Sequence, residues 1–399
     1  MPQLDNYRQF DGLAWATGYL RNALAYQGVT APHTDEPYSE ALLMGISGGI
    51  AAGYFAFEYE GYDPHLHFLT RYPFNEEPVA AFERLAIPTE PRTTRDAQKA
   101  VANVIDALVA GKPVVVWLDV LSLLEDKPQD AWWMINPVLV YGYDMQQGSV
   151  HIADRARVPI VVEAERFAAA RARLSKTRHR TMTLGAPDPD RLPNEVETGI
   201  RACIDIFTGK PPVGAASSWG FAAYDKWIDL LTKSKHKQSW GKMFAPCPRM
   251  YAGLTSTYKY LEVFYTGGAG ARGLYADFLE EAAAILGKPA LRAVAGQFRA
   301  CAERWTAFTR DVLPDAIPLL KEARDLLTRE YTLYLERGIA TDGEQAQIIG
   351  RLAALRQAMD SDFPLDEAGA TAMRERLAEH LVGIRTAEQA AFVDLKAAL

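Results

Sequence analysis

Two carboxylates in the first half of the sequence, Glu40 and Asp154, are candidates for proton transfer. Burial can raise the pKa of a carboxylate into the range where it works as a general base, and Glu40 could act in this way. The favoured alternative is an acidic residue at the N1 or N2 position of a helix, where the helix dipole favours negative charge. Ser39 is then the expected N-cap. Asp154 could belong to a site or could cap the loop that follows it.

Other polar residues of this half have both a binding and a structural interpretation. Arg21 and Asn22 could bind a carboxyl or phosphopantetheine group, or could form a salt bridge and a helix-to-loop hydrogen bond. Asn136 could orient a substrate carbonyl through its amide, or could simply begin a strand that continues with Pro137. Tyr141 lies on an alternating strand pattern, which favours a core position.

Metal and cofactor chemistry finds little support in the sequence. Cys203, Cys247 and Cys301 are far apart and odd in number, which argues against a disulfide framework or a structural zinc site. His65 and His67 would share one face of a strand, but without a third ligand nearby they predict a solvated edge. The glycine cluster at 45–49 lacks the pattern of a phosphate-binding loop. We therefore expect no metal and no cofactor.

Composition narrows the possible partners. The chain has 49% hydrophobic and 23% charged residues and a net charge of −7, which is globular and argues against nucleic acid. A basic stretch at 171–180 could still receive an acidic carrier protein. The amino terminus lacks a signal-peptide pattern, and the apolar run at 113–124 is too short for a membrane span. We expect a cytoplasmic protein without a membrane partner.

The element pattern changes near residue 185. Before it, helices are predicted at 13–28, 40–45, 94–110 and 163–174, with strands in 51–61, 113–118, 137–143 and 150–153, the last two joined by a turn at 144–148. A linker rich in proline and acidic residues covers 186–195. Helical patterns follow at about 195–208, 216–233, 253–265, 272–286, 289–312, 315–337, 343–360 and 366–397. The prediction is an α/β (α+β) protein with a mixed or antiparallel sheet in domain 1–185 and an all-helical domain at 195–399.

An ordered set of motifs resembles the butirosin biosynthesis protein H family. The set covers nearly the whole chain and comprises Thr17–Leu24 (TGYLRNAL), Ser39-Glu40, Gly45–Ile50 (GISGGI), Pro137–Asp144, Ala153-Asp154-Arg155, and Gly267-Gly268 with Arg272–Leu279 (RGLYADFL). The resemblance implies a papain-like amino-terminal domain in front of a helical domain. It also implies a cysteine that takes an acyl group from a carrier-protein thioester and passes it to an amine, helped by a histidine and by Asp154.

The sequence departs from this family pattern at the reactive positions. Counting back from Arg21 places the expected His-Cys pair on Ala14-Trp15, and the expected histidine falls on Asn136. Asp154 remains, and Trp15 would fill the space that a thioester needs. If the scaffold is kept, residues 14–15 should lie within about one side-chain length of Asn136, with Asp154 beside it, because triad members act at hydrogen-bond distance.

Two functions remain open. The protein could transfer an acyl or aminoacyl group from an acyl carrier protein or other thioester to a small-molecule amine without a cysteine nucleophile. It could instead be an inactive binding or scaffold partner in the same type of pathway. The catalytic candidates are Asn136, Asp154 and Glu40. The expected substrate-binding set is Ala14, Trp15, Arg21, Asn22, Ser39 and Tyr141.

Overall fold

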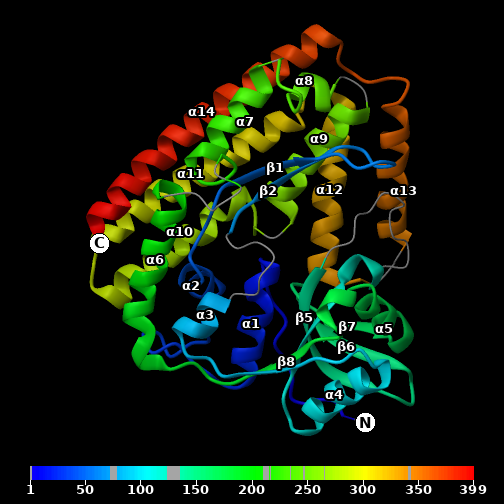
Figure 1. The fold of residues 1–399 in the computed structure, drawn as a ribbon, viewed down its shortest axis with the longest axis vertical. Helices are drawn as coiled ribbons and strands as arrows, with labels where there is room; N and C mark the ends of the chain where they lie inside the picture. The colour runs from blue at the N-terminus through cyan, green and yellow to red at the C-terminus, as the bar shows by residue number, and fades with distance from the viewer. Residues whose placement is uncertain are drawn as a thin grey trace. The chain divides into compact units, whose positions relative to one another are not determined.

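The computed structural model describes residues 2–71, 79–123, 135–209, 215, 217–233, 235–245, 248–264, 266–339 and 343–399. Within these ranges every strand ends before residue 185, and from there to the carboxyl end the regular elements are helices (Figure 1). An antiparallel-sheet region followed by a helix-rich region confirms the predicted α+β class. Among the helices described, none is both long and apolar enough to cross a membrane.

The main sheet has six strands in the order β3-β8-β4-β5-β6-β7, and all its neighbours pair antiparallel. Valine and other β-branched residues fill its central strands, which are buried along almost their whole length. The strands are β3 (Thr89–Arg92), β4 (Val114–Asp119), β5 (Ile135–Asp144), β6 (Ser149–Ala153), β7 (Ile160–Glu163) and β8 (Thr181–Leu184).

The turn between β5 and β6 is the one that the sequence predicted. The Asp144 carboxylate accepts hydrogen bonds from the backbone N–H groups of Gln146 and Gln147, each at 2.8 Å. Gly148 then adopts a φ of +63°, which a glycine reaches without strain. This turn sets Asp144 opposite Ser149, and a register shift between Val140 and Gly142 then brings Leu139 opposite Ala153, so that Asp154 lies directly beyond the end of β6.

Helices cover this sheet by burying an apolar stripe. In α4 (Ala97–Val109) the stripe includes Val104 and Leu108 and packs against β4, β5 and β8. Asp96 begins this helix by accepting a hydrogen bond from the Lys99 N–H at 2.8 Å. The other helices before residue 185 are α1 (Trp15–Tyr26), which packs against β5, α2 (Glu40–Ile46), α3 (Val79–Arg84) and α5 (Ala164–Ala172).

Contacts within the chain define two units that do not follow a single cut at the 186–195 linker. The first contains residues 1–43, 77–192 and 330–349, and the second contains 44–76, 193–329 and 350–399. The strands β1 (Gly53–Phe57) and β2 (His65–Leu69) belong to the second unit, where they pair with each other and pack against α7 and α9 (Figure 1). A two-stranded hairpin needs such a partner because it buries too little apolar surface alone.

The second unit is otherwise helical, and its long helices α10, α11 and α14 pack in sequence against one another, with α7 on α14. The helices are α6 (Leu192–Thr208), α7 (Phe221–Thr232), α8 (Trp240–Met243), α9 (Pro248–Tyr258), α10 (Arg272–Leu286), α11 (Ala290–Val312), α12 (Pro318–Arg337), α13 (Gly343–Ala358) and α14 (Glu367–Ala398). The carboxyl end of α12 and the start of α13 lie in the range 330–349, which belongs to the first unit.

A fully buried ion pair joins α10 to α14 in this core. Arg272 donates to the Glu388 carboxylate through Nε at 2.8 Å and Nη2 at 3.1 Å. The same carboxylate accepts from the Tyr224 hydroxyl at 2.6 Å and the Trp305 indole at 2.8 Å, while Arg272 Nη1 donates to the Ala51 carbonyl at 3.2 Å. Burial alone would lower the pKa of Arg272, but the adjacent carboxylate outweighs burial and holds the pKa above its ordinary value.

Replacing Glu388 with alanine should lower the free energy of unfolding by about 3–5 kcal/mol, because the Arg272 charge would stay buried without its partner. Urea unfolding followed by tryptophan fluorescence measures this loss. Glu322→Ala is the matched control, since it removes the partner of Arg351 from an exposed ion pair and should change stability little. Equal losses in the two variants would contradict a special role for the buried pair.

Candidate functional site

Glu40 holds the amino end of α1. Its carboxylate accepts hydrogen bonds from the backbone N–H groups of Leu13 at 2.7 Å and Ala14 at 2.8 Å, and from the Thr17 hydroxyl at 2.9 Å. The first N–H groups of a helix have no partner inside the helix, and a carboxylate there also meets the positive end of the helix dipole. The buried Glu40 side chain therefore closes the site where the resemblance expects a reactive residue.

This cap comes from a different helix because α1 lacks one of its own. Ala14 occupies the N-cap position and offers no side-chain acceptor. The start of α2 is served separately, since Ser39 accepts from the Leu42 N–H at 2.9 Å, as the sequence predicted. The carboxylate of Glu40 is thus available for α1 instead of its own helix. Sequence reasoning missed this role because the two partners are 26 residues apart.

Burial raises the pKa of Glu40 above its ordinary value near 4.5, although the hydrogen bonds from Ala14, Leu13 and Thr17 act in the opposite direction. The shift itself is in the direction that a general base requires. However, both carboxylate oxygens already accept hydrogen bonds from α1 or from the residue before it. The geometry is that of a buried structural cap.

Asp154 is held by two side chains. The Tyr334 hydroxyl donates to its Oδ2 atom, and Arg155 Nη2 lies 3.5 Å from the same oxygen. The Arg155 guanidinium also lies over the Tyr334 ring, 5.2 Å from its centroid. Burial, followed by the Asp154 charge, raises the pKa of Tyr334 well above its ordinary value, so its proton stays on the phenol.

Tyr334 reaches this position from the last turns of α12. The backbone supports the approach, because the Arg157 N–H donates to the Leu335 carbonyl at 2.8 Å. Tyr331 lies one turn earlier on α12, and its buried hydroxyl has no hydrogen-bond partner among the described residues. Sequence reasoning missed Tyr334, since 180 residues separate it from Asp154 and no local pattern links the two.

Two glycines allow Arg155 to lie close to α1. A Cβ atom added to Gly12 would lie 3.3 Å from both Cα and Cγ of Arg155 and 3.2 Å from Cα of Gly18. A Cβ at Gly18 would meet Glu40 Oε1 at 3.7 Å and Arg155 Cγ at 3.8 Å. The absence of both side chains therefore brings the Glu40 cap and the Asp154–Arg155 pair to the same part of the first unit.

Arg21 and Asn22 have the structural partners that were weighed against ligand binding. Arg21 forms an ion pair with Asp11 at 3.2 Å. Asn22 donates through Nδ2 to the Asp11 carbonyl at 3.0 Å and, at 3.5 Å, to the Asp154 carbonyl. Both residues therefore fasten α1 to its neighbours, and Asn22 links this helix directly to the Asp154 backbone.

Asn136 is the candidate whose polar atoms remain unused. It lies in β5 opposite Leu118 of β4, its side chain is fully buried, and neither amide atom finds a hydrogen-bond partner among the described residues. By extension of the β5–β6 register, Asp154 falls opposite Val138, two residues along the same face as Asn136. Helix α1 packs against β5, the strand that carries Asn136. The expected closeness of Asn136 to residues 14–15 stays a prediction.

The remaining members of the predicted binding set are core residues. Ala14 and Trp15 are buried, at 7% and 6% exposure. Tyr141 stacks on Tyr7 with ring centroids 4.5 Å apart and meets Phe10 edge-on at 5.6 Å. The adjacent aromatic residues Trp132 and Trp133, which the sequence offers as pocket lining or core, lie outside the described residues. A bulky indole therefore occupies the position where the family pattern expects a thiol.

Thiol chemistry has no substitute nucleophile in the described part of the chain. Cys203 and Cys301 both belong to the second unit and are buried. Burial raises the pKa of each thiol to about 12, which keeps it protonated and unreactive at neutral pH. Cys247 lies outside the described residues.

The expected solvated histidine edge is corrected by the packing of β2. The rings of His65 and His67 lie 4.9 Å apart, and His67 stacks on Tyr260 at 4.5 Å. Burial, followed by the charge of His65, lowers the pKa of His67 to about 3, so this ring is neutral. Aromatic neighbours, which the sequence pattern of β2 alone did not reveal, cover the strand. Within the ranges described, no three potential metal ligands gather.

The raised pKa of Glu40 predicts a pH dependence with a definite sign. A carboxyl whose pKa is higher in the folded than in the unfolded state binds its proton more tightly when folded, so its contribution to stability falls as the pH rises from about 4.5 through the raised value. Relative to Glu40→Gln, which does not titrate, wild-type protein should lose stability over that range. Urea unfolding of both proteins at a series of pH values tests this, and a constant or growing wild-type advantage would contradict it.

Removing the hydroxyl of Tyr334 should destabilise the first unit. Tyr334→Phe leaves the Asp154 carboxylate without its phenol donor and should cost about 1–3 kcal/mol in the free energy of unfolding. Tyr331→Phe is the control on the same helix, because that hydroxyl has no partner to lose among the described residues, and stability should hold or improve. Thermal or urea unfolding compares the pair, and equal effects would argue against the Asp154 contact.

Two family models match the chain in the order that the motifs predicted. The model described as butirosin biosynthesis protein H, N-terminal, matches residues 15–155, and the one described as Domain of unknown function (DUF4872) matches residues 165–316. The first range contains every predicted site residue except Ala14. A comparison with curated proteins gave no match. On these two consecutive matches, the chain belongs to the butirosin biosynthesis protein H-like family, a family of secondary metabolism.

Proposed function

We propose that this protein is a non-catalytic binding or scaffold member of a natural-product pathway, with the family's fold but without its thiol-dependent acyl transfer. The observation that carries the proposal is the Glu40 carboxylate on the N–H groups of Leu13 and Ala14. The proposal includes a cytoplasmic location and a papain-like arrangement of the first unit.

The amino end of α1 is unsuited to covalent acyl transfer in two respects. A helix start can activate a thiolate, but here Ala14 and Trp15 stand in its place. Free N–H groups at such a position can also stabilise an oxyanion, yet the N–H groups of Ala14, the N-cap, and of Leu13 before it already donate to Glu40. An incoming acyl oxygen would have to displace a buried, hydrogen-bonded carboxylate, which leaves that charge without partners.

Proton transfer lacks a free base as well. The amide of Asn136 does not titrate and cannot replace an imidazole. Asp154 accepts a hydrogen bond from Tyr334 and lies beside Arg155, and these two contacts fix its orientation. These contacts support a rigid, structural role for the acid that the family pattern would use to orient a histidine.

One observation favours transfer as a second candidate. The buried Asn136 amide has unused hydrogen-bonding atoms among the described residues, and its N–H group could hold the carbonyl of a carrier-bound thioester while a small-molecule amine attacks directly. Positioning of two reactants can accelerate such a reaction without a covalent intermediate. An acyl carrier protein and an amine would then be the partners.

The two candidates differ in a direct assay. Purified protein is mixed with acyl-pantetheine thioesters and a panel of primary amines, and mass spectrometry follows amide formation. The non-catalytic role predicts product at the protein-free rate, for wild type and for Asn136→Ala alike. Product above that rate would overturn it, and loss of that product in folded Asn136→Ala would assign the transfer to the amide. Circular dichroism checks that both proteins are folded.

A further inference from the structure

Four exposed cations gather on one surface of the first unit, where the start of α4 meets the segment after α5. The Thr94 N–H donates to the Arg178 carbonyl at 2.8 Å, so the two segments are joined through their backbones. Buried Arg171 adds a second link, because it donates to the carbonyls of Ala100 at 3.4 Å and His179 at 2.8 Å. We call the set of exposed side chains on these segments the basic surface: Arg95, Lys99, Lys176 and Arg178.

One acid, Asp96, lies between Arg95 and Lys99 in the sequence, and its exposed carboxylate accepts the Lys99 backbone N–H. Among the described residues, none of the four side chains of the basic surface forms an ion pair or a hydrogen bond, whereas Arg173 nearby is paired with Asp119 at 3.0 Å. The chain as a whole carries a net charge of −7, so this group of unpaired cations differs in sign from the protein's overall charge. Such a surface favours binding partners that carry negative charge.

The backbone holds this surface in a costly conformation. Arg178 and His179 have φ values of 50° and 48°, in the left-handed region that residues with a side chain seldom adopt. Each such residue costs about 1–2 kcal/mol. The Thr94 and Arg171 hydrogen bonds to these two carbonyls offset that cost and keep the segment closed against α4.

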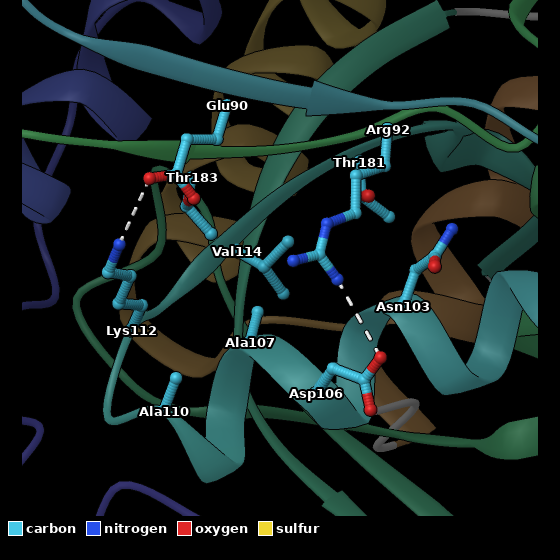
Figure 2. Close-up of a pocket in the computed structure, with 10 residues that line it drawn as sticks. All are labelled: Glu90, Arg92, Asn103, Asp106, Ala107, Ala110, Lys112, Val114, Thr181 and Thr183. Carbon is cyan, nitrogen blue, oxygen red and sulfur yellow. Dashed lines mark hydrogen bonds and ion pairs between the residues drawn. The ribbon is translucent and has the colours of Figure 1, made fainter.

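A small polar hollow lies further along α4, the helix that carries Lys99 of the basic surface (Figure 2). It has a volume of about 60 Å³ and is lined by residues of β3, α4, β4 and β8. Figure 2 shows its two ion pairs, Arg92 with Asp106 at 3.6 Å and Lys112 with Glu90 at 3.4 Å, on opposite sides of Val114. The acids of the hollow are therefore already paired with cations.

Two polar side chains of the hollow are available to hydrogen-bond a ligand. Asn103 and Thr181 are both more than nine-tenths buried, and neither side chain makes a hydrogen bond within the described residues. Asn103 lies one turn after Lys99 on α4, and Thr181 is paired with Arg92 across the strands. The hollow thus has room and hydrogen-bonding groups for the end of one polar side chain, one helical turn along α4 from Lys99.

We propose that the basic surface is a docking site for an acidic protein segment, whose carboxylates meet the four free cations while one polar side chain enters the hollow at Asn103. Nucleic acid fits less well, because stable binding to a polyanion uses many phosphate contacts and the chain is acidic overall. A lipid surface fits less well because, among the described residues, Val109 is the one large exposed apolar residue on these segments, and it lies at the opposite end of α4 from Arg95 and Lys99. The proposal goes beyond the proposed function and does not depend on whether thioesters are turned over.

A fluorescein-labelled polyglutamate peptide and full-length protein test the docking site by fluorescence anisotropy at low salt. Wild type should bind, and binding should weaken with added salt, since exposed charges are screened. Arg95→Glu combined with Lys176→Glu should weaken binding about tenfold or more, because attraction becomes repulsion. The matched control is Lys235→Glu with Lys237→Glu, which makes the same change of charge at exposed lysines of the second unit and should bind like wild type.

Several outcomes would overturn the proposal. No binding by wild type, or equal weakening in both double variants, would leave only a general effect of net charge. Tighter binding to a DNA duplex or to phosphatidylserine vesicles than to the peptide would assign the surface to nucleic acid or to a membrane. Asn103→Leu should weaken peptide binding about threefold to tenfold through the lost hydrogen bond. Unchanged affinity in that variant would remove the hollow from the docking site.

Discussion

The amino end of α1 presents backbone N–H groups that need an acceptor, and Glu40 supplies it from 26 residues away. Because the carboxylate is buried, it must keep its hydrogen bonds to Leu13, Ala14 and Thr17, and this need ties the start of α2 to the start of α1. The close approach at Gly12 and Gly18 then brings Arg155 against the same helix. Arg155 and Asp154 follow β6, so one capping interaction is connected through packing to the main sheet.

The first and second units place buried charge in different ways. In the second unit Arg272 and Glu388 satisfy each other and draw in Tyr224 and Trp305, so that the carboxylate has no unused oxygen. In the first unit Asn136 is as deeply buried but has no partner among the described residues. An unpaired buried amide costs free energy unless water or a ligand satisfies it. The Asn136 amide in β5 therefore keeps hydrogen-bonding capacity that the described residues do not use.

Local chemistry explains what could be predicted from the sequence. The class of the fold, the α1 and α4 helices, the Ser39 cap and the β5–β6 turn at Asp144 all depend on residues within a few positions of one another. Apolar periodicity and capping residues report such features directly. The short strands β3 and β8 escaped because four residues, partly polar, carry little periodic signal.

The candidate site depended on pairings that no local pattern contains. The sequence identified Glu40, Asn136 and Asp154 as polar residues of interest, but their partners come from distant segments: Glu40 caps another helix, and Asp154 is held by Tyr334. Tertiary packing also explains why residues 44–76 belong to the second unit and residues 330–349 to the first. Which apolar face covers β1 and β2, or which unit receives residues 330–349, is decided by tertiary packing and not by composition.

The assignment of residues 330–349 to the first unit also sets an order of events during synthesis. Asp154 leaves the ribosome 180 residues before Tyr334, and chain growth of about 5–20 residues per second makes this interval on the order of ten to forty seconds. Throughout it, the Asp154 carboxylate lacks its phenol partner and the Arg157 N–H lacks the Leu335 carbonyl. The contacts of the first unit can therefore be completed only after most of the second unit has been synthesised.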